Sequence, residues 1–309
     1  MTFLSVLFAL FLEALIPHRL MSGWRRSMQR ISDELLVDFE ALGAPSLSWL
    51  HWWLPTLIWV LVCGVFYSWL SGFSTLLSVL FSLAVLCVGL RYSSVVQTLT
   101  SLQLYLNQGD LFRSRETLLN WLKAYGLPLP VLKTERDVII RAMEHGVERS
   151  LRQFFSLLFW FVLVPGPVMV AFYLAVWWSV WRERAWHQTH EMPTDKPTLH
   201  QVWRADKRKA YLSPRFALYL LEWIPARLLA LALMPKLGWA EAMESWKAAG
   251  THSPMSNRAR LVSLLHKALG LEETDALGPD KLAEFRKWIS QAALIWLAGI
   301  GLLSLIGSL

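Results

Sequence analysis

The sequence contains few cysteines, and both lie in apolar runs. Of 309 residues only two are cysteines, Cys63 and Cys87. If the two runs form a helical hairpin that turns near Gly72, helical rise places the cysteines about 14 and 22 Å from the turn. A disulfide needs Cα atoms within about 7 Å of each other. We therefore expect two free thiols.

The sequence also lacks the short motifs of common enzyme classes. It has no GxxxxGK[ST] phosphate loop, no HExxH pattern and no GxSxG turn. His187, His190 and His200 accompany Glu191 and Asp195, but without the spacing of a zinc site. Nothing supports hydrolysis by a recognised nucleophile, and we expect no resident metal or cofactor.

Apolar surface is what the chain has in excess. Hydrophobic residues make up 55% of the chain, 18 residues are Trp, and the mean hydropathy is +0.38. This composition predicts an all-α, polytopic membrane protein. The net charge of +7 would suggest nucleic acid in a soluble protein. Here basic loops facing anionic lipid explain it, so we expect a lipid bilayer and no nucleic acid as partner.

Residues 1–90 form the predicted N-terminal membrane region. Its first apolar run, 2–16, contains Glu13 and is followed by no cleavage site, so we expect it to be retained. A helical hairpin is predicted over 53–90, with an uncharged turn at Gly72. Arginines flank the hairpin, which places its flanks in the cytoplasm and its turn outside. These arginines are Arg19, Arg25, Arg26, Arg30 and Arg91.

Residues 91–153 are charged enough to form a small helical cytoplasmic region. The segment 107–110, Asn-Gln-Gly-Asp, is typical of a helix end, a glycine cap and a new start, so it predicts an antiparallel helix pair. A second break follows at 126–130. The segment 134–137, Thr-Glu-Arg-Asp, then resembles a capping box that opens a helix running toward 154.

The C-terminal membrane region, 154–309, opens with 25 uncharged residues, 154–178, interrupted by Pro-Gly-Pro at 165–167. This stretch is long enough to cross a core of about 30 Å, but the prolines break a straight helix. Backbone broken at membrane depth must lie in protein or line a cavity. Because the connection 182–214 is basic, we expect a re-entrant path that keeps Lys207 cytoplasmic.

Residues 216–234 repeat the pattern of a broken apolar helix and include Glu222, Pro225 and Arg227. Charged groups at such depth usually face protein or water. Glu222 and Arg227 either bond to backbone freed at the break, or Glu222 sits at the interface. The remaining segments are a polar stretch, 236–287, and a final span, 289–306.

The helix after Thr134 carries a polar stripe. Spacings of three and four place Arg141, Glu144, Glu148 and Arg152 on one face, with His145 and Arg149 beside them. The carboxylates could hold Mg²⁺ and the arginines a phosphate or carboxylate. The alternative is a surface helix laced by ion pairs. The candidate ligand-binding residues are thus Arg141, Glu144, Glu148, Arg152, Glu222 and Arg227.

Two stretches resemble the integral-membrane AmpE and CobD/CbiB superfamily. The first, VERSLRQFFSLLFWFVLVPGP at 147–167, is similar to a family segment with an A-P-L-F-[FW] stretch and a Gly/Pro break. The second, LLEWIPARLLALAL at 220–233, is similar to the family's [DN]-x-[LV]-P-[AV]-R-L motif, and its Pro-Ala-Arg-Leu is the specific match. Weaker similarities lie at 106–111, 252–254 and 268–270.

Within this superfamily the CobD/CbiB proteins are implied to be adenosylcobinamide-phosphate synthases, which use ATP and Mg²⁺. Their E-x-x-x-E-N-x-x-D-G pattern is matched by Glu144 and Glu148, the candidate catalytic residues of that alternative. Arg149, Arg152 and Gln153 replace its Asn, Asp and Gly. Mg-ATP needs carboxylate-held cations near the phosphates, and Arg152 reverses the local field.

Further departures place the chain closer to AmpE. The sequence 176–179, Val-Trp-Trp-Ser, replaces an N-T-L-D element, and apolar residues near Leu218 replace an acidic pair. The resemblance to AmpE implies a regulatory protein of the bacterial inner membrane, linked to β-lactamase induction and cell-wall stress, with no secure catalytic residue.

We expect the protein to act by binding or signalling, with an anionic or amphipathic ligand at the cytoplasmic mouth of its broken helices. A membrane protein partner is a further expectation. Mg²⁺ and ATP enter only with the synthase alternative. A transporter is the third hypothesis, because transporters use broken helices, although no inverted repeat is visible.

Overall fold

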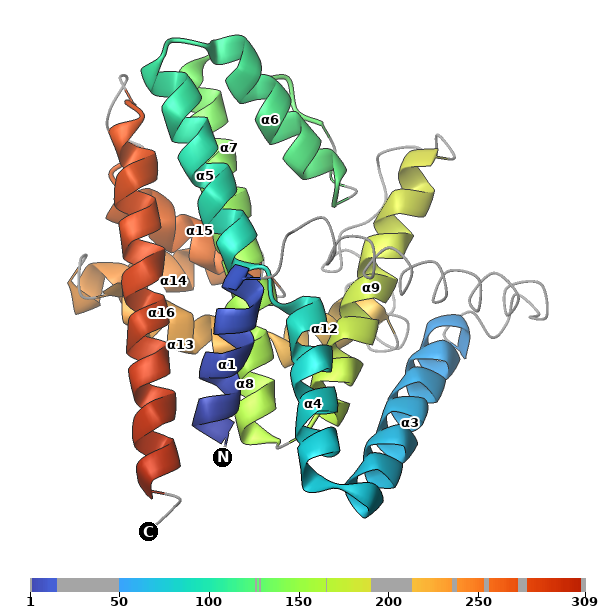
Figure 1. Ribbon diagram of the computed structural model, residues 1–309. Coiled ribbons are helices and arrows are strands. Elements are labelled where there is room, and N and C mark those ends of the chain that lie inside the picture. Colours follow the sequence, from blue (N-terminus) through green and yellow to red (C-terminus); the bar gives the residue numbers. More distant parts are fainter. Residues whose placement is uncertain are drawn as a thin grey trace.

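The computed structural model describes residues 2–15, 50–125, 127, 129–164, 166–189, 213–234, 238–252, 256–271 and 277–306. All of its regular elements are helices, which confirms the predicted all-α class for the described residues (Figure 1). The helices are α1 Thr2–Leu15, α3 Leu50–Phe73, α4 Thr75–Gly89, α5 Tyr92–Asn107, α6 Leu111–Lys123, α7 Glu135–Ser150, the π-helix η2 Leu151–Phe155, α8 Ser156–Leu163, α9 Val168–Thr189, α12 Pro214–Leu221, α13 Trp223–Leu233, α14 Trp239–His252, α15 Asn257–Ala268 and α16 Asp280–Ile306.

Three stretches of the described helices are long and apolar enough to cross a membrane, namely Thr56–Phe73, Thr75–Asn107 and Asp280–Leu305. Counting the bent pair α12 and α13 as one span gives a fourth. The polar start of α16 shows that the predicted final span at 289–306 is the second half of a longer helix. Membrane association is therefore indicated by length and composition.

Helices α3 and α4 form the predicted hairpin. The turn falls at Ser74, whose hydroxyl accepts a hydrogen bond from the Leu76 amide and caps α4. Cys63 and Cys87 are both buried and neither forms a disulfide, as expected. The N-terminal α1 packs against α4 and α16, and the side chain of Glu13 accepts hydrogen bonds from the backbone amide and hydroxyl of Ser93.

Two short sequence patterns, a glycine turn and a capping box, form the local structures that were predicted for them. Gly109 has a φ of 71°, a left-handed conformation that glycine adopts readily, and it separates α5 from α6. Asp110 then caps α6 by accepting from the Arg113 amide. Thr134 and Asp137 form a reciprocal capping box at the start of α7.

Helix α7 continues through η2 into α8 without a gap, and α9 then returns toward the other end of the molecule (Figure 1). The carbonyl of Gln153, in the π-helix, accepts a hydrogen bond from the Arg91 amide at 3.4 Å. The interruption between α8 and α9 falls at the Pro-Gly-Pro segment. A Cβ on Gly166 would lie 3.6 Å from the Tyr67 ring, so this turn lies beside α3.

Helices α12 and α13 cross behind the upright helices in Figure 1 and meet at a bend of 44°. Helix α12 packs on α9, whereas α13 packs on η2, α15 and α16. The break lies at Glu222, three residues before Pro225, which α13 accommodates in its first turn. Because Pro225 has no amide hydrogen, the Leu221 carbonyl lacks its usual helical donor, and the Trp160 indole donates to it at 3.0 Å.

Helices α14 and α15 pack against each other as a pair, and α15 also contacts α7. Helix α7 contacts α5, α6, α15 and α16, so its central turns are enclosed. One hydrophobic cluster extends from α1 to α16. The polar stripe of α7 is consequently buried by α15.

Candidate functional site

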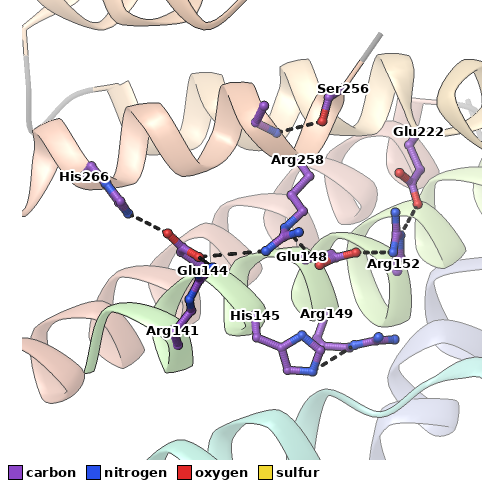
Figure 2. Close-up of polar contacts among 11 residues, drawn as sticks. Arg141, Glu144, His145, Glu148, Arg149, Arg152, Glu222, Ser256, Arg258 and His266 are labelled. Atoms are coloured by element: carbon purple, nitrogen blue, oxygen red, sulfur yellow. Dashed lines mark hydrogen bonds and ion pairs between the residues drawn. The ribbon is translucent and has the colours of Figure 1, made fainter. Parts of the chain in front are cut away.

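Arg152 lies at the centre of a buried ion-pair network. Its Nε lies 2.7 Å from a Glu222 oxygen, and its Nη1 contacts Glu148 (Figure 2). Glu222 also accepts a hydrogen bond from the Tyr173 hydroxyl at 3.3 Å. Arg152 thus joins the π-helix η2 to the break between α12 and α13.

Glu144 and Glu148 connect the same network to α15. Arg258 lies 3.1 Å from one Glu148 oxygen and 3.8 Å from Glu144. Glu144 also contacts His266 Nε2 at 3.2 Å and Arg141 at 3.0 Å. We use the term ion-pair network for these seven residues: Arg141, Glu144, Glu148, Arg152, Glu222, Arg258 and His266.

Burial differs across the ion-pair network. The Glu148 side chain is 1% exposed and that of Glu222 is 4% exposed, whereas Arg141 is half exposed. Removing charged groups from water is expensive unless their partners remain close. The fold therefore depends most on the buried ion pairs among Glu148, Arg152 and Glu222. Arg141 lies at the exposed edge of the network.

The surroundings of Glu144 favour its charged form. Burial by itself raises the pKa of this carboxyl, but the His266 hydrogen bond and the charges of Arg141, His266 and Arg258 outweigh burial. The net effect is a pKa below the ordinary value of 4.5. Glu144 is consequently an anion at neutral pH and holds its cationic neighbours in place.

His145 and Arg149 point to the opposite side of α7 from Glu144 and Glu148 (Figure 2). The Arg149 guanidinium stacks 3.4 Å over the Tyr125 ring, and its Nε donates to His145 Nε2 at 3.3 Å. Burial and the neighbouring Arg149 charge hold the pKa of His145 well below 6.5. His145 is thus a neutral hydrogen-bond acceptor. The contacts of Arg149 with His145 and Tyr125 are separate from the ion-pair network.

The structure places Arg227 outside the ion-pair network. Its guanidinium stacks 3.5 Å over Trp223, and Nη1 donates to the Trp223 carbonyl at 2.9 Å. The Trp223 carbonyl lies inside α13, whereas the carbonyl freed at the break is that of Leu221, which accepts from Trp160, so Arg227 does not make the expected bond to freed backbone. Glu222 instead forms an ion pair with Arg152, so Glu222 and Arg227 contact different parts of the molecule.

The i,i+3 and i,i+4 pairs on α7 form, but α7 is not the surface helix of the alternative interpretation, because α15 covers its polar face. Arg258 and His266 were not predicted as site residues. They lie eight residues apart on one helix, so they share a face of α15. Their pairing with α7 is a tertiary contact that no local spacing indicates. His190 and His200 lie outside the described residues, as does the side chain of His187.

Within the described ranges, no group of three or more His, Cys, Asp or Glu side chains is arranged to hold a metal ion. The carboxylates of Glu144 and Glu148, which could act as metal ligands, are instead paired with arginines and a histidine. No protein-family model, no curated protein and no solved structure matches the chain.

Proposed function

We propose that this chain is a multi-pass regulatory protein of the bacterial inner membrane, similar in role to AmpE, that acts in β-lactamase induction and cell-wall stress. It works by binding an anionic or amphipathic ligand at its broken helices and passing the change to a membrane protein partner. The candidate spans and the similarity of 147–167 and 220–233 to the superfamily support this proposal.

One observation favours a regulatory protein over a synthase. Glu144 and Glu148 are the two residues that match the acidic pattern of the synthases, and both are already neutralised by cations of the chain itself. A Mg²⁺ ion that bridges phosphates needs carboxylates with free oxygens in a negative field. Here Arg141, Arg152 and Arg258 surround them, so Mg-ATP would first have to displace these arginines.

The ion-pair network suits a binding protein because it couples three elements through few contacts. Arg152 bridges η2 to Glu222 at the bend, and Arg258 bridges α7 to α15. An anion that competes for either arginine would release α12–α13 or α15 from α7. Differential binding to two such arrangements is the physical requirement for a ligand-driven signal.

The first test is a product assay on purified protein in detergent, with adenosylcobyric acid, Mg-ATP and aminopropanol phosphate, read by mass spectrometry beside an authentic synthase. We expect no product while the control enzyme is active and the protein is folded. Product formation that is lost in Glu144→Gln or Glu148→Gln would overturn the regulatory proposal and establish an enzyme.

The second test measures the role directly. In a strain that lacks the gene, β-lactamase activity is measured after exposure to a β-lactam, with wild-type or variant chains supplied. We expect Arg152→Met and Arg227→Ala to abolish the response that wild type restores, at equal amounts of membrane protein. Arg113→Gln, an exposed arginine on α6, is the control that retains the response. A full response with both variants contradicts the proposal.

A further inference from the structure

Helix α13 has an apolar face that no described element covers. From the end of α12 into α13, the residues Leu220, Trp223, Ile224, Leu228 and Leu231 are 38–52% exposed. Leu220, Ile224, Leu228 and Leu231 recur every three or four residues, with Trp223 beside Ile224, and therefore form one helical stripe. The opposite face, including Ala226, Leu229 and Leu233, is buried. A helix that is apolar on both faces suits contact with protein on one side and lipid on the other.

A pair of arginines lies at this stripe. Arg227 lies beside the stripe residue Leu228, and its guanidinium stacks on the Trp223 ring. The guanidinium carbon of Arg227 lies 5.7 Å from the Trp246 ring, and that of Arg260 lies 5.6 Å from the same ring. The two charges come from α13 and α15, and Trp246 comes from α14. Three elements thus bring two cations to one indole.

Gly250 makes room for Arg260. A Cβ at this position of α14 would lie 3.2 Å from the nearer terminal nitrogen of the Arg260 guanidinium. A side chain there would make the flexible end of Arg260 move by a few tenths of an ångström. Glycine costs about 1 kcal/mol relative to alanine inside a helix, so a glycine here is consistent with a defined position for Arg260.

The chemistry of this surface matches a phospholipid. Arg227 takes part in none of the carboxylate ion pairs found among the described residues. Guanidinium groups bind phosphate oxygens through paired donors. Tryptophan side chains prefer the headgroup level of a bilayer, and an apolar helix face beside them suits acyl chains.

We propose that Arg227 and Arg260 bind the phosphate of an anionic phospholipid in the cytoplasmic leaflet, with Trp223 and Trp246 at the headgroup and the apolar stripe of α13 along the acyl chains. The inference rests on the proposed membrane-bound function and names the ligand class of the Arg227 site. Because α13 contacts η2, which holds Arg152, the bound lipid lies on the far side of the helix that contacts the ion-pair network.

Native mass spectrometry of the full chain in detergent tests the proposal. The protein is exposed to equal amounts of phosphatidylglycerol and phosphatidylethanolamine, and the lipids retained are counted. We expect a preference for phosphatidylglycerol in wild type. Each arginine near an anionic surface contributes about fivefold in affinity, so Arg227→Gln with Arg260→Gln should remove most of this preference. The matched control Arg113→Gln should keep it.

Two further arms separate the alternatives. Gly250→Ala leaves both arginines in the sequence but shifts the end of Arg260 by a few tenths of an ångström, and we expect it to reduce the preference by less than about fivefold; it serves as the second variant if the double variant does not fold. Inorganic phosphate is added as a competitor. If it displaces the lipid at equal phosphate concentration, a soluble phosphate is the ligand and the proposal is wrong.

An unchanged preference in the double variant also overturns the lipid proposal. The outcome is separable from the regulatory role, because lipid retention is measured on purified protein and β-lactamase induction in cells. If a variant keeps its lipid preference but loses induction, the lipid is not the ligand on which the signal depends. That outcome contradicts the lipid proposal and leaves the proposed regulatory function in place. Loss of lipid preference with normal induction supports the lipid site and contradicts the regulatory role of Arg227.

Discussion

The residue that most depends on its partners is Glu148, which is 1% exposed and contacts Arg152 and Arg258. Replacing it with glutamine keeps the shape but removes one of the two carboxylates that Arg152 and Arg258 each contact, leaving Arg152 with Glu222 and Arg258 with Glu144. Breaking a buried ion pair from one side costs about 3–5 kcal/mol. We expect Glu148→Gln to lower the apparent melting temperature in detergent far more than Arg141→Gln.

Arg141→Gln is the matched control for Glu148→Gln, because it removes one member of an ion pair whose arginine is half exposed. Exposed pairs contribute about 0–1 kcal/mol. The two variants change the net charge by one unit in opposite directions, so a general effect of net charge would shift their melting temperatures in opposite directions. Equal shifts would show that the network does not hold α7 and α15 together.

Glu144 gives a prediction about acid stability. Because its pKa in the folded protein lies below the ordinary value of 4.5, its stabilising contribution is present above that pH and disappears as pH falls through the folded value. The stability difference between wild type and Glu144→Gln should therefore shrink when thermal unfolding is repeated below pH 4.5. Glu244, whose side chain is 79% exposed, supplies the control Glu244→Gln. A difference that grows on acidification contradicts the geometry.

Residue spacing predicted the contacts within α7 and its continuation η2, but not those between helices that pack against each other. The pairs Arg141–Glu144 and Glu148–Arg152 follow from helical geometry alone. The contact between Arg152 and Glu222 joins residues 70 positions apart, and neither Arg258 nor His266 lies in a motif that the sequence offered. Such contacts depend on how whole helices pack, which periodicity does not determine.

At the scale of elements, a side-chain hydrogen bond replaces one backbone hydrogen bond at the bend between α12 and α13. Pro225 cannot donate to the Leu221 carbonyl, and the Trp160 indole does so instead. Trp160→Phe should destabilise the protein, since a hydrogen bond contributes about 0.5–1.5 kcal/mol and a buried carbonyl left without a donor costs about 1–3 kcal/mol.

A double-mutant cycle isolates this exchange. In a Pro225→Ala background the new amide can donate to Leu221, so Trp160→Phe should cost less there than in wild type. Thermal unfolding of the two single variants, the double variant and wild type gives the coupling, expected to be about 0.5 kcal/mol or more. Additive costs would mean that Trp160 stabilises the bend through packing only.

The sequence located this helix break within a few residues, and the offset has a physical cause. Proline disturbs the turn before it, because it removes a donor to the fourth residue back and its ring crowds that carbonyl. The interruption therefore falls at Glu222 and not at Pro225. Gly109 and the Thr134 capping box were placed correctly because each depends on neighbouring residues alone. The π-helix at 151–155 had no such local signal.

At the scale of the whole molecule, the arrangement predicts which ends share a side of the membrane. The α3–α4 turn, the α8–α9 turn and the end of α16 lie at one end of the upright helices, whereas the α5–α6 turn lies at the other (Figure 1). The positive-inside rule predicts that the α5–α6 end faces the cytoplasm, because Arg91 and the basic connection at 182–214 flank the apolar segments.

Single cysteines test this topology. Cys63 and Cys87 are both buried, so a Cys63→Ala and Cys87→Ala background removes the native thiols. We expect a membrane-impermeant maleimide to label Ser71→Cys in intact cells, because Ser71 is exposed near the α3–α4 turn. Arg113→Cys, at the opposite end, and Lys207→Cys, which lies outside the described residues, should react only after lysis. Labelling of Arg113→Cys in intact cells would invert the proposed orientation, whereas labelling of Lys207→Cys alone would mean that the Pro-Gly-Pro segment crosses the membrane once without returning.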